Sequence, residues 1–294
     1  MNKVSSYLKE EFLDCCELFL CSFLDRYGYE YRHLFVRNWC LRDSNLFEDN
    51  IKISNDYVYI ERANFWEELN NTFGINTIWH FNVLENFLQK GDNLFLHLVD
   101  AKHLPWMKIY FNRESAEHYI YIYSYDDQSN QFYVIDLKLN FRGWVDFDII
   151  HNAYASMGKR TFEYTKPNYK INTYNESNIK KSQDEAYRSI KKIARFLNEM
   201  KETKESDLLN KQDILAFRIK QVIEVKLSFV EFLKSNHDTD SSILQKACIS
   251  TVKSWKILRT YLMKGKIKRH YDIEKIYNIA DNILENELNV LKHF

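Results

Sequence analysis

A cysteine, a histidine and an aspartate stand in an order that can support acyl transfer through a thiol. Cys15 precedes a run of apolar residues, His118 begins the aromatic stretch HYIYIY, and Asp136 ends the stretch YVID. A thiol becomes a strong nucleophile when a helix N-terminus or a nearby imidazole favours its thiolate. We therefore predict that Cys15 is a nucleophile, that His118 is its general base and acid, and that Asp136 orients the imidazole.

The segment that carries Cys15 is predicted to be a helix that begins near the thiol. Apolar side chains recur from Phe12 onward with nearly the 3.6-residue period, and Gly28 follows where a helix would end. A helix running unbroken from Tyr7 would instead leave Cys15 in mid-helix, where the dipole does not support a thiolate. Cys16 is the rival nucleophile, but it lies on the apolar stripe, which favours a buried role.

Two β-rich stretches are predicted to bring the histidine and the aspartate together. Residues 118–125 and 131–137 are separated by turn-forming residues, so they most simply form an antiparallel hairpin. In such a hairpin the start of one strand lies beside the end of the next. Asp136, eighteen residues after His118, is therefore expected next to the imidazole.

The chain is expected to divide at residue 170 into two parts with different secondary structure. Residues 1–170 mix helix with strands, which predicts an α+β domain with an antiparallel sheet. Besides the hairpin, its strands are expected at residues 57–61, 94–100 and 108–111. Residues 171–294 have only helical periodicity and predict an all-α helical bundle region. Its helices are expected near residues 186–200, 208–233, 241–263 and 272–291.

Composition excludes several classes of protein. Hydrophobic residues make up 45% of the sequence and charged residues 28%, with only 6 Gly and 2 Pro, which indicates an ordered globular chain. The 41 basic and 41 acidic residues cancel, which argues against a protein that coats nucleic acid or an anionic membrane. No apolar run reaches the length of a signal-peptide core or a membrane span, so a cytoplasmic protein is expected.

The cysteines and histidines point to free thiols and not to disulfides or a metal site. Five cysteines are an odd number in a chain that is expected to be cytoplasmic. No pairs of cysteine and histidine have the spacing of a zinc site. His97 and His103 flank Asp100 without a suitably spaced third ligand, so structural or surface roles are expected for them and no metal is assigned.

The two parts carry opposite charge. Residues 171–294 contain 23 basic and 17 acidic side chains, whereas residues 1–170 contain 18 and 24. The excess is concentrated in residues 241–271, which have eight basic side chains and no acidic one. This basic stretch is predicted to attract an anionic partner. The alternative is that it faces the acidic first part of the same chain.

Several motifs together resemble one family of cysteine enzymes. The run from Cys15 to Gly28 resembles the cysteine, helix and glycine element of papain-like bacterial cysteine enzymes. HYIYIYSYDD followed by YVID resembles their histidine strand, turn and aspartate strand. KGDNLFLHLVD at residues 90–100 and LPW at residues 104–106 resemble a segment of the butirosin biosynthesis protein H-like group. That group pairs a papain-like domain with a helical C-terminal region, and the chain is also similar to the amide-forming enzyme of closthioamide biosynthesis.

The resemblance implies a papain-like fold and an amide-forming acyltransferase of antibiotic-type natural product biosynthesis. Cys15 would take an acyl group from the phosphopantetheine thioester of an acyl or peptidyl carrier protein, and a small-molecule amine would attack the acyl-enzyme. The enzyme itself would bind no cofactor. Because such carriers are commonly acidic, Lys264, Lys266 and Lys268 in the basic stretch are candidate contacts for the carrier or for the pantetheine phosphate.

Other roles remain open from the sequence alone. A cysteine peptidase or other hydrolase of the same fold would use water in place of the amine. A binding or scaffold protein would keep the fold without chemistry, and residues 1–14 lack the glutamine that related peptidases place before the nucleophile as an oxyanion donor. Trp106 and Trp144 are candidates for lining a substrate pocket beside the hairpin, with core packing as the alternative.

Overall fold

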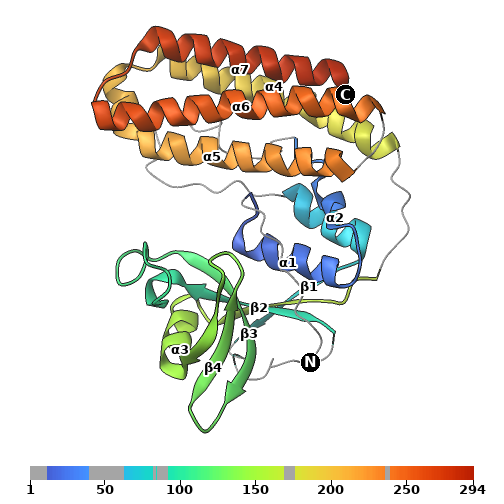
Figure 1. The fold of residues 1–294 in the computed structure, drawn as a ribbon, viewed down its shortest axis with the longest axis vertical. Coiled ribbons are helices and arrows are strands. Elements are labelled where there is room, and N and C mark those ends of the chain that lie inside the picture. Colours follow the sequence, from blue (N-terminus) through green and yellow to red (C-terminus); the bar gives the residue numbers. More distant parts are fainter. Residues whose placement is uncertain (1–11, 40–62, 82–83, 85–91, 169–175, 236–238) are drawn as a thin grey trace. The chain divides into compact units, whose positions relative to one another are not determined.

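The structure is a computed structural model that describes residues 12–39, 63–81, 84, 92–168, 176–235 and 239–294 (Figure 1). It has an α+β architecture that divides into two units, each discontinuous in sequence. One unit comprises residues 1–31 and 69–170, and the other comprises residues 32–68 and 171–294. The break at residue 170 lies where helical periodicity takes over in the sequence. The grouping of residues 32–68 with the helices differs from the continuous first domain that was expected.

The first unit is built on a six-stranded antiparallel sheet with the strand order β1-β6-β2-β3-β4-β5. The strands are β1 (Thr77–Phe81), β2 (Leu94–Asp100), β3 (Glu117–Asp126), β4 (Gln131–Asp136), β5 (Phe141–Asp146) and β6 (Arg160–Tyr164). The antiparallel sheet expected from the sequence is thus confirmed. β2 has the predicted bounds, and β3 and β4 form the predicted hairpin. The strands β1, β5 and β6 were not predicted.

One predicted strand, at residues 108–111, is wrong. This segment lies in consecutive turns in which the N–H groups of Tyr110 and Phe111 both donate to the carbonyl of Met107 at 2.8 Å. Asn112 follows with a φ of 55°, in the left-handed region that ends such turns. Local hydrogen bonds therefore use the groups that a strand would offer to a neighbour. The other predicted strand, at residues 57–61, lies outside the described residues.

Helices cover both faces of strand β3. On one face Ile120 and Ile122 share a buried core with Ile150 of helix α3 (Phe147–Ser156). On the other face the ring of Tyr121 lies 6.4 Å from the ring of Phe19, which belongs to helix α1 (Cys15–Arg26). Successive side chains of a strand point to opposite faces, so α1 and α3 pack on opposite sides of this strand (Figure 1). The start of β3 is thereby held between two layers.

Strand β1 forms one edge of the sheet and carries exposed apolar side chains. Trp79 is 53% exposed and Phe81 59% exposed, and the ring of Trp79 lies 4.4 Å from the ring of Phe162 in β6.

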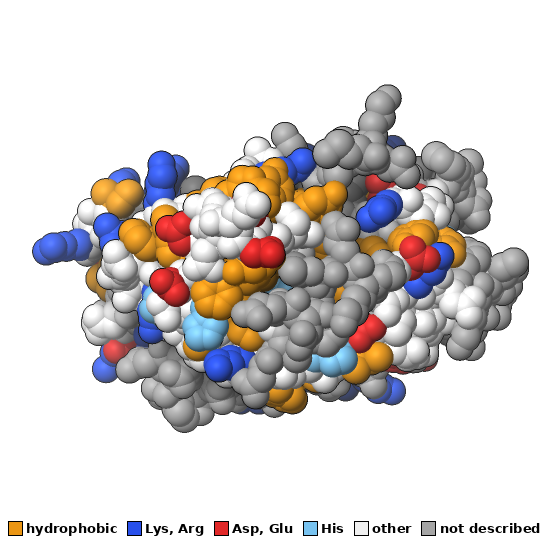
Figure 2. Space-filling model, turned by 90° about the horizontal axis from the view of Figure 1, so that it is seen from below, with side chains coloured by type: hydrophobic (Ala, Val, Ile, Leu, Met, Phe, Trp, Pro, Cys, Tyr) orange, Lys and Arg blue, Asp and Glu red, His pale blue; other side chains and the backbone are white. Residues whose placement is uncertain are grey.

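Figure 2 shows one face of the molecule on which hydrophobic, acidic and basic side chains are interspersed among the coloured residues. That face therefore presents no field of a single charge sign within the described part of the chain.

The second unit contains the four helices predicted for residues 171–294. They are α4 (Glu176–Glu202), α5 (Glu205–Ser235), α6 (Thr239–Lys268) and α7 (Ile273–His293), and Figure 1 shows them side by side. All four contribute to one buried core that includes Phe196, Leu215, Trp255 and Ile283. No helix among the described residues has the length and apolar character needed to cross a membrane.

Residues 32–39 join the helical unit through buried polar contacts. The guanidinium of Arg37 bonds Glu185 of α4, with Nη2 to Oε1 at 2.5 Å. The ammonium of Lys226 in α5 lies 3.7 Å from the ring centre of Trp39 and 2.9 Å from Glu287 of α7. The division between the two units then falls within helix α2 (Ala63–Phe73). The buried charge of Glu185 is thus compensated by a segment far away in sequence, and that of Lys226 by Glu287 within the helices.

The turn between α6 and α7 depends on a glycine. A Cβ at Gly265 would lie 1.8 Å from Cε1 of Tyr271, whose ring is buried against the α6 backbone. The hydroxyl of Tyr271 lies 2.8 Å from the carbonyl oxygen of Leu262 and 2.9 Å from Gln212 Oε1, so it has two acceptors for its one proton. Because these contacts hold the hydroxyl end of the ring, the ring cannot move aside without losing them.

We predict that Gly265→Ala lowers the free energy of unfolding by about 1–3 kcal/mol, because the new methyl group overpacks the Tyr271 ring. In a Tyr271→Ala background the same change should be neutral or stabilising by up to about 1 kcal/mol, because alanine is the better helix former. Urea unfolding of the four proteins measures both effects. An equal loss in both backgrounds would show that the ring contact is not the cause.

Candidate active site

Helix α1 begins at Cys15, as the apolar pattern predicted. Asp14 is the N-cap residue, and its carboxylate accepts a hydrogen bond from the N–H of Glu17 at 2.7 Å. The Glu17 carboxylate in turn accepts from the N–H of Asp14 at 3.0 Å, which completes a capping box. Cys15 is therefore the first helical residue, at the positive end of the helix dipole. Its own N–H has no acceptor within the helix and is a candidate oxyanion donor.

His118 and Asp136 are hydrogen bonded to each other inside the first unit. Nε2 of His118, at the start of β3, lies 2.8 Å from Oδ2 of Asp136, at the end of β4. His118 is 5% exposed and Asp136 is fully buried. The hairpin thus brings the imidazole and the carboxylate together in the way that their spacing predicted.

Two further donors complete the surroundings of the Asp136 carboxylate. Nε1 of Trp106 donates to Oδ2 at 2.9 Å, and the N–H of Leu139 donates to Oδ1 at 3.1 Å. Burial alone raises the pKa of this carboxyl, but the hydrogen bonds and charge of His118, together with Trp106 and Leu139, outweigh it and lower the pKa. The carboxylate is therefore ionised at neutral pH and holds the imidazole in place.

The thiol of Cys15 is the second partner of His118. The hydrogen bond to Asp136 uses Nε2, so Nδ1 is the nitrogen left to exchange a proton with the thiol. Burial lowers the pKa of His118, but the charge and hydrogen bond of Cys15 and the contact with Asp136 raise it well above its ordinary value. The three residues predicted from the sequence thus lie together, with His118 between Cys15 and Asp136.

Cys16, the rival nucleophile, lies in a different environment. It is 3% exposed, and its Sγ lies 3.3 Å from the hydroxyl of Tyr164 in β6. Burial and the nearby Asp14 carboxylate raise the pKa of the Cys16 thiol well above its ordinary value. Burial likewise raises the pKa of Cys248 in α6. Both thiols are therefore protonated and inert at neutral pH.

The two tryptophans proposed from the sequence differ in their contacts. The ring of Trp106 stacks on Phe141, with the ring centres 4.0 Å apart, while its N–H bonds Asp136. Trp106 therefore orients the carboxylate. Trp144 is 50% exposed on β5 and makes an edge contact with Tyr133. Its side chain lies at the surface of the sheet and does not take part in the hydrogen bonds around Asp136.

His97, His103 and Asp100 have separate partners. Nδ1 of His97 lies 3.0 Å from the Thr161 hydroxyl, and burial lowers the pKa of this histidine to about 3. His103 bonds Ser156, and the Asp100 carboxylate accepts hydrogen bonds from Ser115 and from backbone N–H groups in the following loop. Among the described residues, no group of three or more His, Cys, Asp and Glu side chains is arranged to hold a metal ion.

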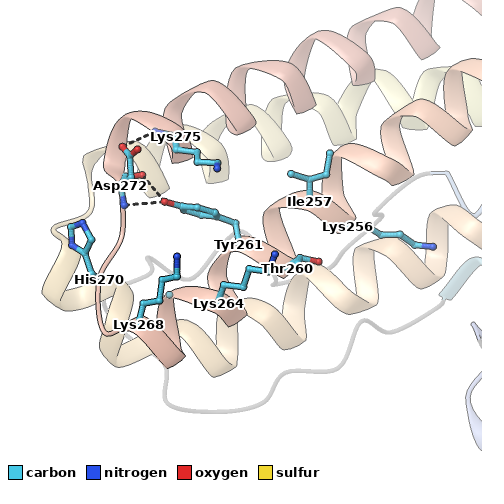
Figure 3. A pocket seen from close by; sticks show the side chains of 10 residues that line it. Lys256, Ile257, Thr260, Tyr261, Lys264, Lys268, His270, Asp272 and Lys275 are labelled. Atoms are coloured by element: carbon cyan, nitrogen blue, oxygen red, sulfur yellow. Dashed lines mark hydrogen bonds between the residues drawn. The ribbon is translucent and has the colours of Figure 1, made fainter.

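The three lysines proposed from the sequence lie near the end of α6 in the second unit. Lys264 and Lys268 line a cavity of about 650 Å³ at the turn between α6 and α7 (Figure 3). Lys266 instead bonds both carboxylate oxygens of Asp213 in α5, at 2.7 and 2.8 Å. Lys266 is therefore paired with a carboxylate and does not line the cavity, whereas Lys264 and Lys268 do.

Sequence reasoning missed the contacts that connect the end of the hairpin to its surroundings. Lys138, two residues after Asp136, donates from Nζ to the carbonyl of Leu13 at 2.5 Å, immediately before the N-cap of α1. The bonds from Trp106 and Leu139 to Asp136 were also not foreseen. Each joins residues whose contact depends on loop conformation, and loops leave no periodic pattern in the sequence.

No protein-family model matches the chain, and no curated protein matches it. The resemblance to papain-like cysteine enzymes therefore depends on the motifs and spacing of this sequence. The geometry around Cys15 is an independent observation on the chain itself.

We predict that iodoacetamide at neutral pH alkylates Cys15 at least about tenfold faster than Cys16 or Cys248, because a cationic imidazole supports only the first thiolate. His118→Ala should remove this difference and make the rate at Cys15 climb steadily with pH. Peptide mass spectrometry of each site, from pH 6 to pH 9, measures the rates. Reaction of Cys15 no faster than Cys248 in the native protein would contradict the assignment.

The His118 and Asp136 pair should also appear in the pH dependence of stability. The lowered pKa of Asp136 makes its contribution present above about pH 3.9 and lost as the pH falls. The raised pKa of His118 makes its contribution fully present below about pH 6.5 and lost as the pH rises through the folded-state value. Asp136→Asn should therefore cost most, about 1–3 kcal/mol, between about pH 4 and 6.5, and less on either side.

Asp126→Asn is the matched control for this measurement. The Asp126 carboxylate is bonded by Ser129 and the N–H of Gln128 and has no imidazole partner in these contacts, and they lower its pKa. Its effect on the urea-derived free energy of unfolding should fade only on the acid side. The pairing of Asp136 with a charged His118 would be wrong if both variants followed the same pH profile.

Proposed function

We propose that the chain is a cysteine acyltransferase of papain-like fold that forms amides. The observation that carries the proposal is the position of Cys15, which opens a helix beside an imidazole whose other nitrogen is bonded to a buried carboxylate. In this arrangement a thiol can attack an acyl carbonyl while a neighbouring base accepts and returns the proton.

The first half of the reaction acylates Cys15. The thiolate attacks the carbonyl carbon of an acyl thioester, and the N–H of Cys15 is one donor to the oxygen as it gains charge. When the tetrahedral intermediate collapses, the bond to the leaving sulfur breaks and His118 gives that sulfur its proton. Asp136 stabilises the imidazolium before this transfer. The products are an acyl-enzyme and a free thiol.

The second half transfers the acyl group to an amine. The amine nitrogen attacks the Cys15 thioester while Nδ1 of His118 takes its proton. Collapse of the second intermediate breaks the bond to Cys15 Sγ and releases an amide, with the cysteine returned as the thiolate next to imidazolium. A hydrolase with the same residues would use water at this step, so the acceptor and not the triad separates the two functions.

The choice of donor follows from the family resemblance. It points to the phosphopantetheine thioester of an acyl or peptidyl carrier protein, and to a small-molecule amine in antibiotic-type biosynthesis. The basic stretch of α6 supports an acidic partner, because Lys264 and Lys268 have no carboxylate within ion-pair distance among the described residues. Lys266 contributes less to this surface, since it is already paired with Asp213.

The test uses a pantetheine thioester of a short fatty acid as the donor and a primary diamine as the acceptor. Without the amine, intact mass spectrometry should detect one acyl group on Cys15. Adding the amine should discharge it as an amide at a rate proportional to amine concentration. His118→Ala should slow acylation by about 10²–10⁴-fold, and Trp106→Phe should slow it by about tenfold because Asp136 loses one donor.

Cys248→Ser is the control variant, because this buried thiol lies in the second unit and should leave the acylation rate unchanged. Discharge of the acyl group at one rate whatever the amine concentration, with a free acid as product, would identify a hydrolase. Failure of Cys15 to acylate with any thioester would favour a binding or scaffold protein.

A further inference from the structure

The cavity between the end of α6 and the start of α7 has a strongly basic lining. Its walls include four lysines, one histidine and one aspartate, together with Thr260 and Tyr261. Lys264, Lys268 and Lys275 group around the ring of Tyr261 in Figure 3, and Lys256 lies toward the other end of the groove. The ammonium of Lys275 lies 5.3 Å from the centre of that ring.

The two acidic groups near this cavity are already engaged. Asp272 is the N-cap of α7, and its carboxylate accepts the N–H of Lys275 at 3.2 Å. Glu205 accepts hydrogen bonds from His270 at 2.7 Å and from the N–H of Tyr271 at 2.6 Å. Within the described part of the chain, no carboxylate lies within ion-pair distance of Lys256, Lys264, Lys268 or Lys275. The ammonium groups of these lysines can therefore pair with the negative charge of a ligand.

Helix electrostatics alone do not explain this arrangement. Basic residues in the last turn of a helix favour its negative end, which accounts for Lys268. The same effect disfavours Lys275, because it lies in the first turn of α7, at the positive end. Lys256 lies three turns before the end of α6, beyond the reach of the dipole. The helix dipole therefore accounts for Lys268 alone among the four lysines that line this cavity.

The number of donors distinguishes among anions. Each lysine ammonium offers three N–H donors, whereas a carboxylate has only about four lone-pair sites to receive them. A phosphate or diphosphate group has more oxygens and more charge, and lysine binds such groups as a point charge. The lining contains lysine and no arginine, so it lacks the planar fork that pairs with a carboxylate.

We propose that the groove formed by Lys256, Lys264, Lys268 and Lys275 is a binding site for the phosphate group of a ligand. The ligand can be the phosphorylated prosthetic arm of a carrier protein or a free phosphorylated metabolite, since both present the same chemistry. The groove would accept one phosphate between Lys264 and Lys268, which lie one helical turn apart, and a second toward Lys275. The site goes beyond the acyl transfer proposed for Cys15 and does not require it.

The experiment is calorimetric titration of the full-length Cys15→Ala protein with inorganic pyrophosphate at low salt. We expect saturable binding of one pyrophosphate, weakened by added salt. The double variant Lys264→Gln/Lys268→Gln should weaken binding by about tenfold or more. The matched control is Lys253→Gln/Lys266→Gln, which removes the same charge from the same helix outside the groove and should change affinity by less than about threefold.

Titration with 4′-phosphopantetheine and with unphosphorylated pantetheine separates the two sources of phosphate. Binding of 4′-phosphopantetheine tighter than pyrophosphate assigns the groove to a prosthetic arm, and weaker binding assigns it to a free, multiply charged metabolite. The site is refuted if pyrophosphate gives no saturable binding, or if both double variants weaken it equally. Because Cys15 is absent from the protein titrated, the result is independent of the acyltransferase assay.

Discussion

The hydrogen bond between His118 and Asp136 is the interaction on which the candidate site depends. A carboxylate that is removed from water must have its lone pairs filled by donors, and His118, Trp106 and the N–H of Leu139 supply them. These hydrogen bonds hold the start of β3, the end of β4 and the loop of residues 104–107 together. The bond to Asp136 also engages Nε2 of the imidazole, so that Nδ1 is the ring nitrogen left for the proton transfers of the proposed function.

The helices and strands that the sequence predicted correctly are those that short-range residue patterns specify. Helix α1 has a capping box at Asp14 and a glycine with a φ of 76° at Gly28, and both are short-range signals. The helices α4 to α7 follow the apolar period, and the β3–β4 hairpin has turn residues between two β-rich runs. The order of Cys15, His118 and Asp136 could be interpreted because the helix and the hairpin were both predictable.

The elements that were missed depend on partners far away in sequence. β6 is five residues long and pairs with both β1 and β2, whose paired residues lie 64 to 87 positions earlier. β5 contains Gly143, which interrupts the expected alternation. The contact of Trp106 with Asp136 and the burial of Arg37 against Glu185 similarly join loops or segments with no shared period. Tertiary packing decides all of these. Residues 108–111 failed as a strand for a different reason, because local turn hydrogen bonds to Met107 occupy their N–H groups.

The discontinuity of the helical unit limits how this protein can exchange parts during evolution. Trp39 covers the ammonium of Lys226, and Arg37 neutralises Glu185, so residues 32–39 and the helices must diverge together. A recombination event at residue 170 would deliver helices whose buried charges meet unfamiliar partners, at a cost of several kcal/mol. Transfer as a separate cassette is therefore disfavoured. Substitutions at these paired positions should be correlated among descendants.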